Sequence, residues 1–340
     1  MNKRPAQGLS RRKFLGMTLA GTAGFLSLKP ELVTAEPLPE TTTLRLIQFP
    51  GDLCMAPQHV AEQLLRDEGF TEVQYLKRDG LREFHMALAS GEANINMDFV
   101  PDAVIQLDAG DPIVFLAGGH IGCFELFGSD QVRAVRDLKG KTVAVPELRG
   151  GAITFIASMA AYVGLDPQKD INWVTHSEVE SMQLLAEGKI DAFQGSPPKL
   201  QEFRTKHIGH VMVNGTLDRP WSQYFCCMVI GNREFVRKYP VATKRAVRAI
   251  LKGADLCGRE PERAARLLMD KGYTDNYEIL LQALKEIPYG KWREYNPEDT
   301  VRFYALRLHE AGMIKSTPHK IIAEGTDWRF LNELKKELKG

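Results

Sequence analysis

The chain contains two copies of the same helix-to-strand corner. Residues 88–94 read LASGEAN, and residues 185–191 read LAEGKID. In each copy an amphipathic run of helical period ends in Leu-Ala, and a Gly follows where a helix can end on a left-handed residue. A short apolar stretch then leads to Pro101 or to Pro197. Two similar α/β units predict two lobes that face each other across a cleft, where small molecules bind.

The N-terminus has the features of an export signal. Residues 10–15 read SRRKFL and lead into an uncharged stretch, residues 14–28, that is rich in Ala, Gly and Leu. This order is typical of a twin-arginine signal, and the stretch is shorter than the ~20 apolar residues that a membrane-spanning helix needs. Small residues end at Ala35. We therefore predict that the twin-arginine machinery exports the chain to the periplasm and that cleavage occurs near Ala35.

The charge of the chain excludes a nucleic-acid binder. The whole chain has a formal net charge of +1, and residues 1–35 hold six Lys or Arg residues and one Glu, so residues 36–340 carry a net charge of −4. No cluster of Lys and Arg interleaved with aromatic residues is present. A chain of this length exceeds a usual single domain, which favours two lobes, and no later apolar run is long enough to span a membrane.

The cysteines leave two interpretations open. The chain has five, an odd number, and none of their spacings matches a paired C-x-x-C zinc pattern. Twin-arginine export moves proteins that folded in a reducing cytoplasm, so we expect free or cavity-lining thiols. The alternative is one disulfide, with Cys123 joined to Cys226 or Cys227. The five residues are Cys54, Cys123, Cys226, Cys227 and Cys257.

The first part of the mature chain alternates strands and helices. Strands are expected at residues 44–49, 73–76 and 95–99, with helices that start near Pro57 and that cover residues 81–89. This order predicts a mostly parallel sheet with covered faces.

A second α/β unit begins at residues 137–146, and from Val229 the pattern changes to long helices. We expect this helical tail to pack back on the first lobe, with crossings between the lobes near residues 123–128 and 225–231. The expected parts are a signal peptide of residues 1–35, lobe 1 of residues 36–124 and 229–340, and lobe 2 of residues 125–228.

The order of these motifs along the chain resembles that in the solute-binding proteins of ABC importers. The resemblance is to the group that binds nitrate, sulfonates, taurine and thiamine precursors. The resemblance covers roughly residues 44–338, and it rests on Ala56-Pro57 and on residues 90–94, 137–141 and 188–192. It implies an α/β fold of the type II periplasmic-binding-protein class, with two Rossmann-like lobes joined by two hinge strands. It also implies a monomer that closes on a small-molecule solute and delivers it to a membrane permease.

The family's fold implies that strand ends and helix N-termini face the cleft. The polar candidate is the segment from Arg149 to Thr154, because its glycines let a ligand approach the backbone and the helix N-terminus favours an anion. Arg149 adds a bidentate clamp for a carboxylate or sulfonate. The candidates from the loops after the first strands and from this segment are Asp52, Cys54, Met55, Asp98, Phe99, Arg149, Gly150, Gly151 and Thr154.

The remaining candidates lie near the second corner and the two crossings. Gln194 and Ser196 offer hydrogen bonds, and the aromatic residues Trp221, Tyr224 and Phe225 offer stacking faces, with a core role for one or two of them as the alternative. We expect Cys123 to line the site. We expect His120 to be a hydrogen-bonded hinge residue rather than a metal ligand.

The sequence shows no G-x-S-x-G or H-E-x-x-H motif, so no catalytic residue and no cofactor is predicted. We expect capture of a small organic anion such as a sulfonate or carboxylate. A pyrimidine or other heteroaromatic solute is the alternative, in which Asp52 and Asp98 are its partners. The related thiamine-pyrimidine synthases, which share the fold, and a sensory ligand-binding role are the remaining alternatives.

Overall fold

The structure is a computed structural model that describes residues 36–48, 53–78 and 80–338. Leu38–Gly340 form one compact unit, and the fold of this unit is described below. Within the described ranges every helix is too short or too polar to cross a membrane. The predicted export signal, its cleavage point near Ala35 and the candidate Asp52 lie outside the described residues.

The first sheet has two parallel strands. β1 (Thr43–Gln48) pairs with β2 (Glu72–Lys77), and the connection between them carries η1 (Leu53–Met55), α2 (Ala56–Val60) and α3 (Glu62–Asp67). Pro57 lies in the first turn of α2, where its missing N–H costs no hydrogen bond. The expected strand–helix–strand opening is confirmed here.

The second sheet has the strand order β3-β10-β4 and is buried throughout. Its strands are β3 (Ile95–Phe99), β4 (Ile113–Ile121) and β10 (Phe225–Asn232). Helices α4 (Leu81–Ala89) and α5 (Val100–Ala109) flank β3 in the sequence. β10 is antiparallel to both neighbours, because β4 runs toward the third sheet and β10 returns from it. The expectation of a mostly parallel sheet is therefore wrong for this sheet.

The third sheet has the order β7-β6-β8-β5-β9 and is mixed. β6 is parallel to β7 and β8, whereas β5 is antiparallel to β8 and β9. The strands are β5 (Glu125–Gly128), β6 (Lys141–Val145), β7 (Ile171–Thr175), β8 (Ala192–Gly195) and β9 (His210–Asn214).

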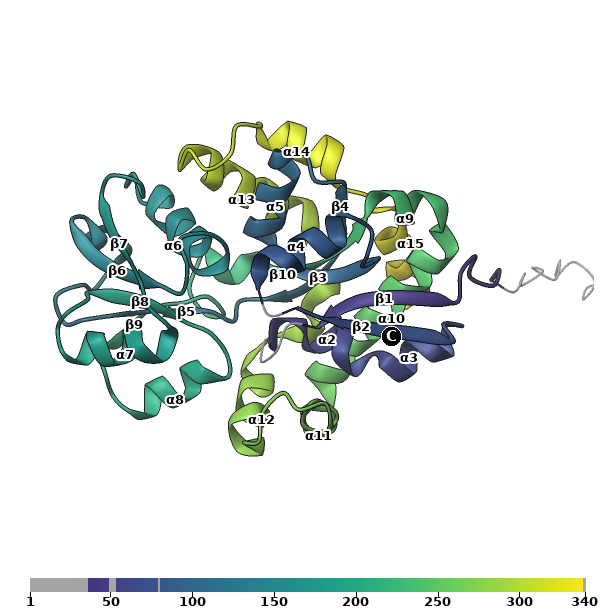
Figure 1. The fold of residues 1–340 in the computed structure, drawn as a ribbon, viewed down its shortest axis with the longest axis horizontal. Helices are drawn as coiled ribbons and strands as arrows, with labels where there is room; N and C mark the ends of the chain where they lie inside the picture. The colour runs from purple at the N-terminus through teal and green to yellow at the C-terminus, as the bar shows by residue number, and fades with distance from the viewer. Residues whose placement is uncertain (1–35, 49–52, 79, 339–340) are drawn as a thin grey trace, which may run out of the picture. The chain divides into compact units, whose positions relative to one another are not determined.

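Helices cover the third sheet on two sides (Figure 1). α7 (Glu178–Ala186) and α8 (Lys199–Thr205) bury Phe127 and Phe193 in a small core of their own. α6 (Gly151–Tyr162) belongs instead to the large core, with Leu126 from the same strand as Phe127. Successive strand residues thus pack on opposite faces, as the two-residue period of a strand requires. The short 3-10 helices η2 (Val135–Leu138) and η3 (Trp221–Gln223) lie in the connections.

The two repeated corners have the same geometry. Gly91 and Gly188 follow α4 and α7 with φ of +78° and +69°, in the left-handed region that favours Gly. Each donates its N–H to the carbonyl three residues earlier, that of Leu88 or of Leu185, at 3.1 Å. The chain then enters β3 or β8. The corner predicted from the repeated sequence is confirmed in both places.

The C-terminal tail is helical, as predicted. Its α-helices are α9 (Arg233–Lys238), α10 (Pro240–Arg259), α11 (Pro261–Asp270), α12 (Tyr277–Glu286), α13 (Pro297–Glu310), α14 (Pro318–Gly325) and α15 (Arg329–Glu337), with η4 (Tyr289–Arg293) between α12 and α13. α10 packs along α2 and β4, and α13 packs against both α5 and α6. Gly253 lets α10 approach α2 closely, because a Cβ there would lie 2.2 Å from the carbonyl oxygen of Pro57. The boundaries of the two lobes stay a prediction.

We expect Gly188→Ala to lower the free energy of unfolding by about 1–2 kcal/mol, because an L side chain strains the left-handed backbone at this corner. No atom lies within 4 Å of a Cβ placed there, so the cost is conformational and not steric. Gly290→Ala is the matched control, since its Cβ also meets nothing and its φ is not positive. Urea unfolding curves measure both, and equal losses in the two variants would contradict the assignment.

Candidate functional site

A cavity of about 240 Å³ lies where η1, α4, β3 and α5 meet the segment that leads into α6. It brings together five of the residues predicted from the sequence. These are Cys54, Met55, Asp98, Phe99 and Gly151. The other residues that line it were not predicted from the sequence, and they are Leu81, Phe84, Met97, Asp102, Phe124, Pro146, Glu147 and Cys227.

Aromatic rings and sulfur atoms form the apolar wall of this cavity. The ring of Phe99 stands edge-on to that of Phe124, with centroids 5.3 Å apart and an interplanar angle of 80°. Phe84 adds a third ring, and Met55 and Met97 add thioethers that adapt to irregular ligand shapes. Such walls suit a flat organic ligand. Phe124 directly follows Cys123 at the predicted crossing, so the crossing itself was the signal that could have found it.

Carboxylates form the polar side of the cavity. Asp98 is the second-to-last residue of β3 and accepts a hydrogen bond from the Nε2 of Gln106 at 2.9 Å. The Nε2 of His85 lies 3.5 Å from Oδ2 of Asp98, the same oxygen that accepts from Gln106. Burial disfavours the charged imidazole, but the charges of Asp98, Asp102 and Asp111 outweigh it, so the pKa of His85 is raised. The negative charge of Asp98 thus favours the protonated form of His85.

Asp102 is the most perturbed carboxyl group at the cavity. Burial raises its pKa to about 7 from an ordinary value of 3.8, and the negative charges of Asp98 and Glu147 add to this. His85 and a hydrogen bond act in the opposite direction. The bond comes from the Oγ1 of Thr154, 2.7 Å from Oδ1 of Asp102, and it joins α5 to α6.

The glycines before α6 make room for the protein's own groups. Gly150 has a φ of +92°, and a Cβ there would lie 2.0 Å from Cδ2 of Leu81. The Oδ2 of Asp102 lies 3.6 Å from that Cβ position and 3.9 Å from the corresponding position at Gly151. The carboxyl group of Asp102 therefore lies beside the N-terminus of α6. Arg149 is exposed and does not line the cavity, which corrects the expectation of an Arg-Gly-Gly cradle for a ligand.

The two binding candidates near the second corner, Gln194 and Ser196, also lie outside the cavity. The Oγ of Ser196 donates to Glu178, at the start of α7. Gln194 is buried in β8 opposite Leu126 of β5. Neither Ser196 nor Gln194 lines the cavity.

Of the aromatic residues at the start of β10, Trp221 and Phe225 belong to the core, whereas Tyr224 is only partly buried. Trp221 packs edge-on against Phe155, and Phe225 is fully buried against Gly118. Tyr224 stacks on Phe303 with centroids 4.0 Å apart, beside a different surface cavity. Trp221, Tyr224 and Phe225 therefore do not line the cavity, whose rings are those of Phe84 in α4, Phe99 in β3 and Phe124 after β4.

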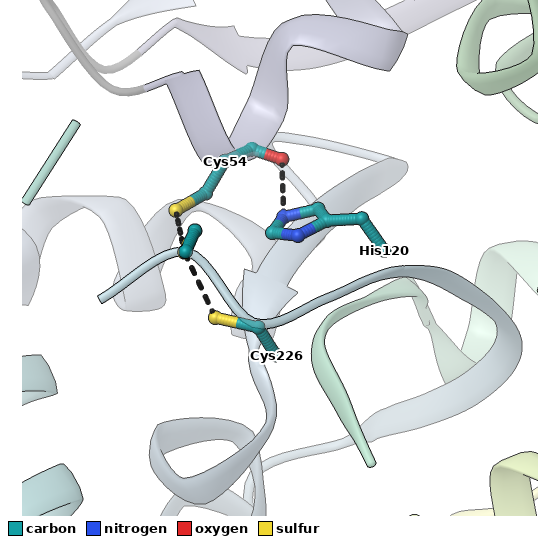
Figure 2. Close-up of side chains that lie close together, drawn as sticks. Cys54, His120 and Cys226 are labelled. Carbon is teal, nitrogen blue, oxygen red and sulfur yellow. Dashed lines mark hydrogen bonds between the residues drawn. The ribbon is translucent and has the colours of Figure 1, made fainter. Parts of the chain in front are cut away.

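Next to the cavity, three cysteines and a histidine converge. Figure 2 shows the thiols of Cys54 and Cys226 and the ring of His120 turned toward one another. The Sγ of Cys123 lies 3.2 Å from the Sγ of Cys54 and 3.2 Å from that of Cys226. These contacts are too long for a disulfide, whose S–S bond is about 2.05 Å. The thiols thus agree with the first of the two interpretations of the cysteines.

The cluster of Cys54, His120, Cys123 and Cys226 is buried and strained. Hydrogen bonds, first of all from Cys123, lower the pKa of Cys54, whereas burial raises the pKa of Cys123 and of Cys226. Cys123 has a φ of +132°, a conformation that costs a non-Gly residue on the order of 1–3 kcal/mol. The ring of His120 lies within hydrogen-bonding distance of the carbonyl oxygen of Cys54, and its role as a hinge residue stays a prediction. Three thiols are also close to it, because the four possible ligand atoms lie within 4.8 Å of one another.

We expect the stability of the protein to fall as the pH rises from about 4 to about 7, to the extent that Asp102 contributes. The pKa of Asp102 is 3.8 ordinarily and about 7 in the folded protein, so the unfolded chain loses this proton at a lower pH. Between these two values deprotonation favours the unfolded chain, and stability falls. Asp102→Asn keeps the acceptor for Thr154 and removes the charge. At pH 8 it is expected to raise the free energy of unfolding by roughly 2–4 kcal/mol.

Asp108→Asn, on the same helix, is the control with the opposite sign. Burial raises the pKa of Asp108, but the N–H groups of Lys315 and Ser316 outweigh this and lower it. Asp108 therefore stabilises the fold above about pH 4, and Asn should destabilise it there. Thermal unfolding at pH 5 and pH 8 measures both variants. Loss of stability in Asp102→Asn at pH 8 would contradict the assignment.

Comparison with known proteins agrees with the fold. A family model described as NMT1/THI5 like matches residues 65–264. No curated protein matched the chain. Among solved structures, the periplasmic nitrate-binding protein NrtA from Synechocystis PCC 6803 has a TM-score of 0.72 and 15% identity, over 89% of this chain and 90% of that one.

Two further structures show the same fold. The ligand-binding component of an ABC-type import system from Staphylococcus aureus, with zinc bound, has a TM-score of 0.68 and 12% identity, over 86% of this chain and 99% of that one. The periplasmic aliphatic sulphonate binding protein SsuA from Escherichia coli has a TM-score of 0.67 and 15% identity, over 82% of this chain and 91% of that one. The predicted periplasmic-binding-protein fold is confirmed, and the family match spans more than half of the chain, so the chain belongs to the NMT1/THI5-like family.

Proposed function

We propose that this protein is the exported solute-binding component of an ABC importer. The observation that carries the proposal is the cavity beside Phe99 and Asp98, whose walls come from η1, α4, β3 and α5 on one side and from residues 146–151 on the other. A solute there touches both groups of elements, so it stabilises the arrangement in which they are close. The closed form is then presented to a membrane permease. The similar structures named as nitrate-binding and sulphonate-binding proteins support this role.

Within this role, the ligand that fits best is a small neutral or cationic heteroaromatic. The cavity volume of about 240 Å³ lies just below the ~300–1,000 Å³ of most small-molecule sites, so the solute is small. Flat rings of Phe84, Phe99 and Phe124 suit stacking. Among the described residues that line the cavity, there is no Lys or Arg, whereas Asp98, Asp102 and Glu147 are present.

The anionic ligand expected from Arg149 has less support. An anion in this cavity would lie near the carboxyl groups of Asp98 and Glu147, which disfavour it. The N-terminus of α6, which would attract an anion, already has the carboxyl group of Asp102 beside it. A protonated heteroaromatic amine instead donates charged hydrogen bonds to Asp98 or Glu147. The binding role is also favoured over the enzyme alternative, since the similar structures are named as binding proteins.

A thermal-shift screen tests the ligand class. We expect aminopyrimidines and related heteroaromatic amines to raise the melting temperature, and sulfonates, carboxylates and nitrate to leave it unchanged. Binding to the native state alone adds about 2.7 kcal/mol of stability at a hundredfold excess over the dissociation constant, which is measurable. A shift with anions alone would contradict the proposed ligand class, and no shift with any solute would contradict the binding role.

Two variants locate the ligand. Asp98→Asn keeps the shape of the cavity. It is expected to make the binding free energy of a cationic ligand less favourable by about 1.5–3 kcal/mol, the usual strength of a hydrogen bond to a charged group. Arg149→Ala is the matched control and should leave the affinity unchanged, because Arg149 is exposed outside the cavity. Isothermal calorimetry measures both. If only Arg149→Ala lowered the affinity for the ligand, the ligand would bind at the start of α6 and not in this cavity.

A further inference from the structure

The cluster beside the cavity has the shape of a metal site. The ligand atoms of its four residues all lie within 4.8 Å of one another. In a tetrahedral site with metal–sulfur bonds of ~2.3 Å, the ligand atoms lie roughly 3.5–3.8 Å apart. The two measured Sγ–Sγ distances of 3.2 Å reach this value if the thiols separate by roughly half an ångström. We infer that Cys54, His120, Cys123 and Cys226 bind a tetrahedral divalent metal ion, with Zn²⁺ the best fit.

The chemistry of the donors selects the metal. Three sulfurs and one imidazole nitrogen are soft ligands that suit Zn²⁺ and exclude Mg²⁺ and Ca²⁺, which need oxygen ligands. All four residues are buried, with at most 4% of each exposed. Four protein ligands complete a tetrahedron, so this metal has a structural role and no open position for a substrate. Binding replaces the thiol protons, which are released to solvent, and no group is oxidised or reduced.

Each ring nitrogen of His120 lies near a backbone carbonyl oxygen, so a metal ion would replace one of these two contacts. Its Nε2 lies 3.1 Å from the carbonyl oxygen of Cys54, and its Nδ1 lies 3.4 Å from that of Ile121. A neutral imidazole carries one N–H. When one nitrogen donates its hydrogen to a carbonyl oxygen, the other keeps a lone pair for the metal. A hydrogen bond of this kind fixes the ring and its tautomer in metal sites.

The position of the cluster gives the metal a structural consequence. Cys54 lies in η1, His120 in β4 and Cys226 in β10, and Cys123 follows β4. A metal there joins the first loop to both strands that connect the second and third sheets. It also holds Cys123 in its strained backbone conformation. Cys54 lines the ligand cavity and Cys123 lines a second cavity of about 330 Å³, so the metal has a path from either side.

Cobalt substitution tests the site in the full-length protein, purified under reducing and oxygen-free conditions. Co²⁺ is the probe, because tetrahedral thiolate coordination gives intense visible absorption and a sulfur-to-cobalt charge-transfer band. We expect a stoichiometric Co²⁺ spectrum that Zn²⁺ displaces. Cys54→Ser and Cys226→Ser should each lower the affinity for Co²⁺ by more than a hundredfold. This exceeds the ~10–100-fold loss of affinity that follows when a residue hydrogen-bonded to a metal ligand is removed.

Cys257→Ser is the matched control. Cys257 is fully buried in α10, outside the cluster, so its loss should leave the spectrum intact. Circular dichroism checks that each variant is folded. X-ray absorption of the Zn²⁺-loaded wild type needs no variant and should count three sulfurs and one nitrogen.

Three results would overturn the inference. The first is a wild-type protein that binds no Co²⁺, or binds it with oxygen and nitrogen ligands only. The second is a spectrum that survives both Cys54→Ser and Cys226→Ser in folded protein. The third is a disulfide between Cys123 and Cys226 in the protein as isolated, shown by mass spectrometry of alkylated peptides.

Discussion

The antiparallel pairing of β4 with β10 is the constraint on which the rest of the structure depends. Its register sets Cys227 opposite His120 and Phe225 opposite Ile121 at the ends where both strands leave the second sheet. Phe225 fits there because Gly118 has no side chain in its path. The pairing therefore places His120 beside the strand that carries Cys226 and Cys227, and it fixes where the chain leaves toward the third sheet. A shift of one residue along β10 would turn the side chains of Phe225, Cys226 and Cys227 to the opposite face.

A buried carboxyl group then controls the charge of the cavity. Asp102 occupies the place at the start of α6 where an external anion would bind, and the hydrogen bond from Thr154 holds it there. Burial keeps it partly protonated near neutral pH, since its pKa is about 7. The cavity can thus take up or release a proton as a charged solute enters, at little cost, while Asp98 stays paired with His85. The same contact between α5 and α6 joins the two sides of the cavity.

Local signals predicted the fold better than the site. The corners at Gly91 and Gly188 were predictable because a left-handed helix end leaves a mark in the sequence, and Cys54, Asp98 and Phe99 were predictable because they follow a first strand or end one. The role of Arg149 was not, because nothing local shows that Asp102, far away in sequence, occupies the helix N-terminus. Trp221 looked like a cavity wall, but long-range packing against Phe155 places it in the core. The cysteine cluster has no sequence spacing to find, since its members come from three separate parts of the chain.

The most direct test of the account is a crystal structure of the protein isolated from the periplasm of its own host with its solute still bound. The account predicts density for a small flat molecule between Phe99 and Phe124, with a polar group within hydrogen-bonding distance of Asp98 or Glu147. A solute bound instead at exposed Arg149, or in the cavity beside Glu125 and Arg204, would contradict it.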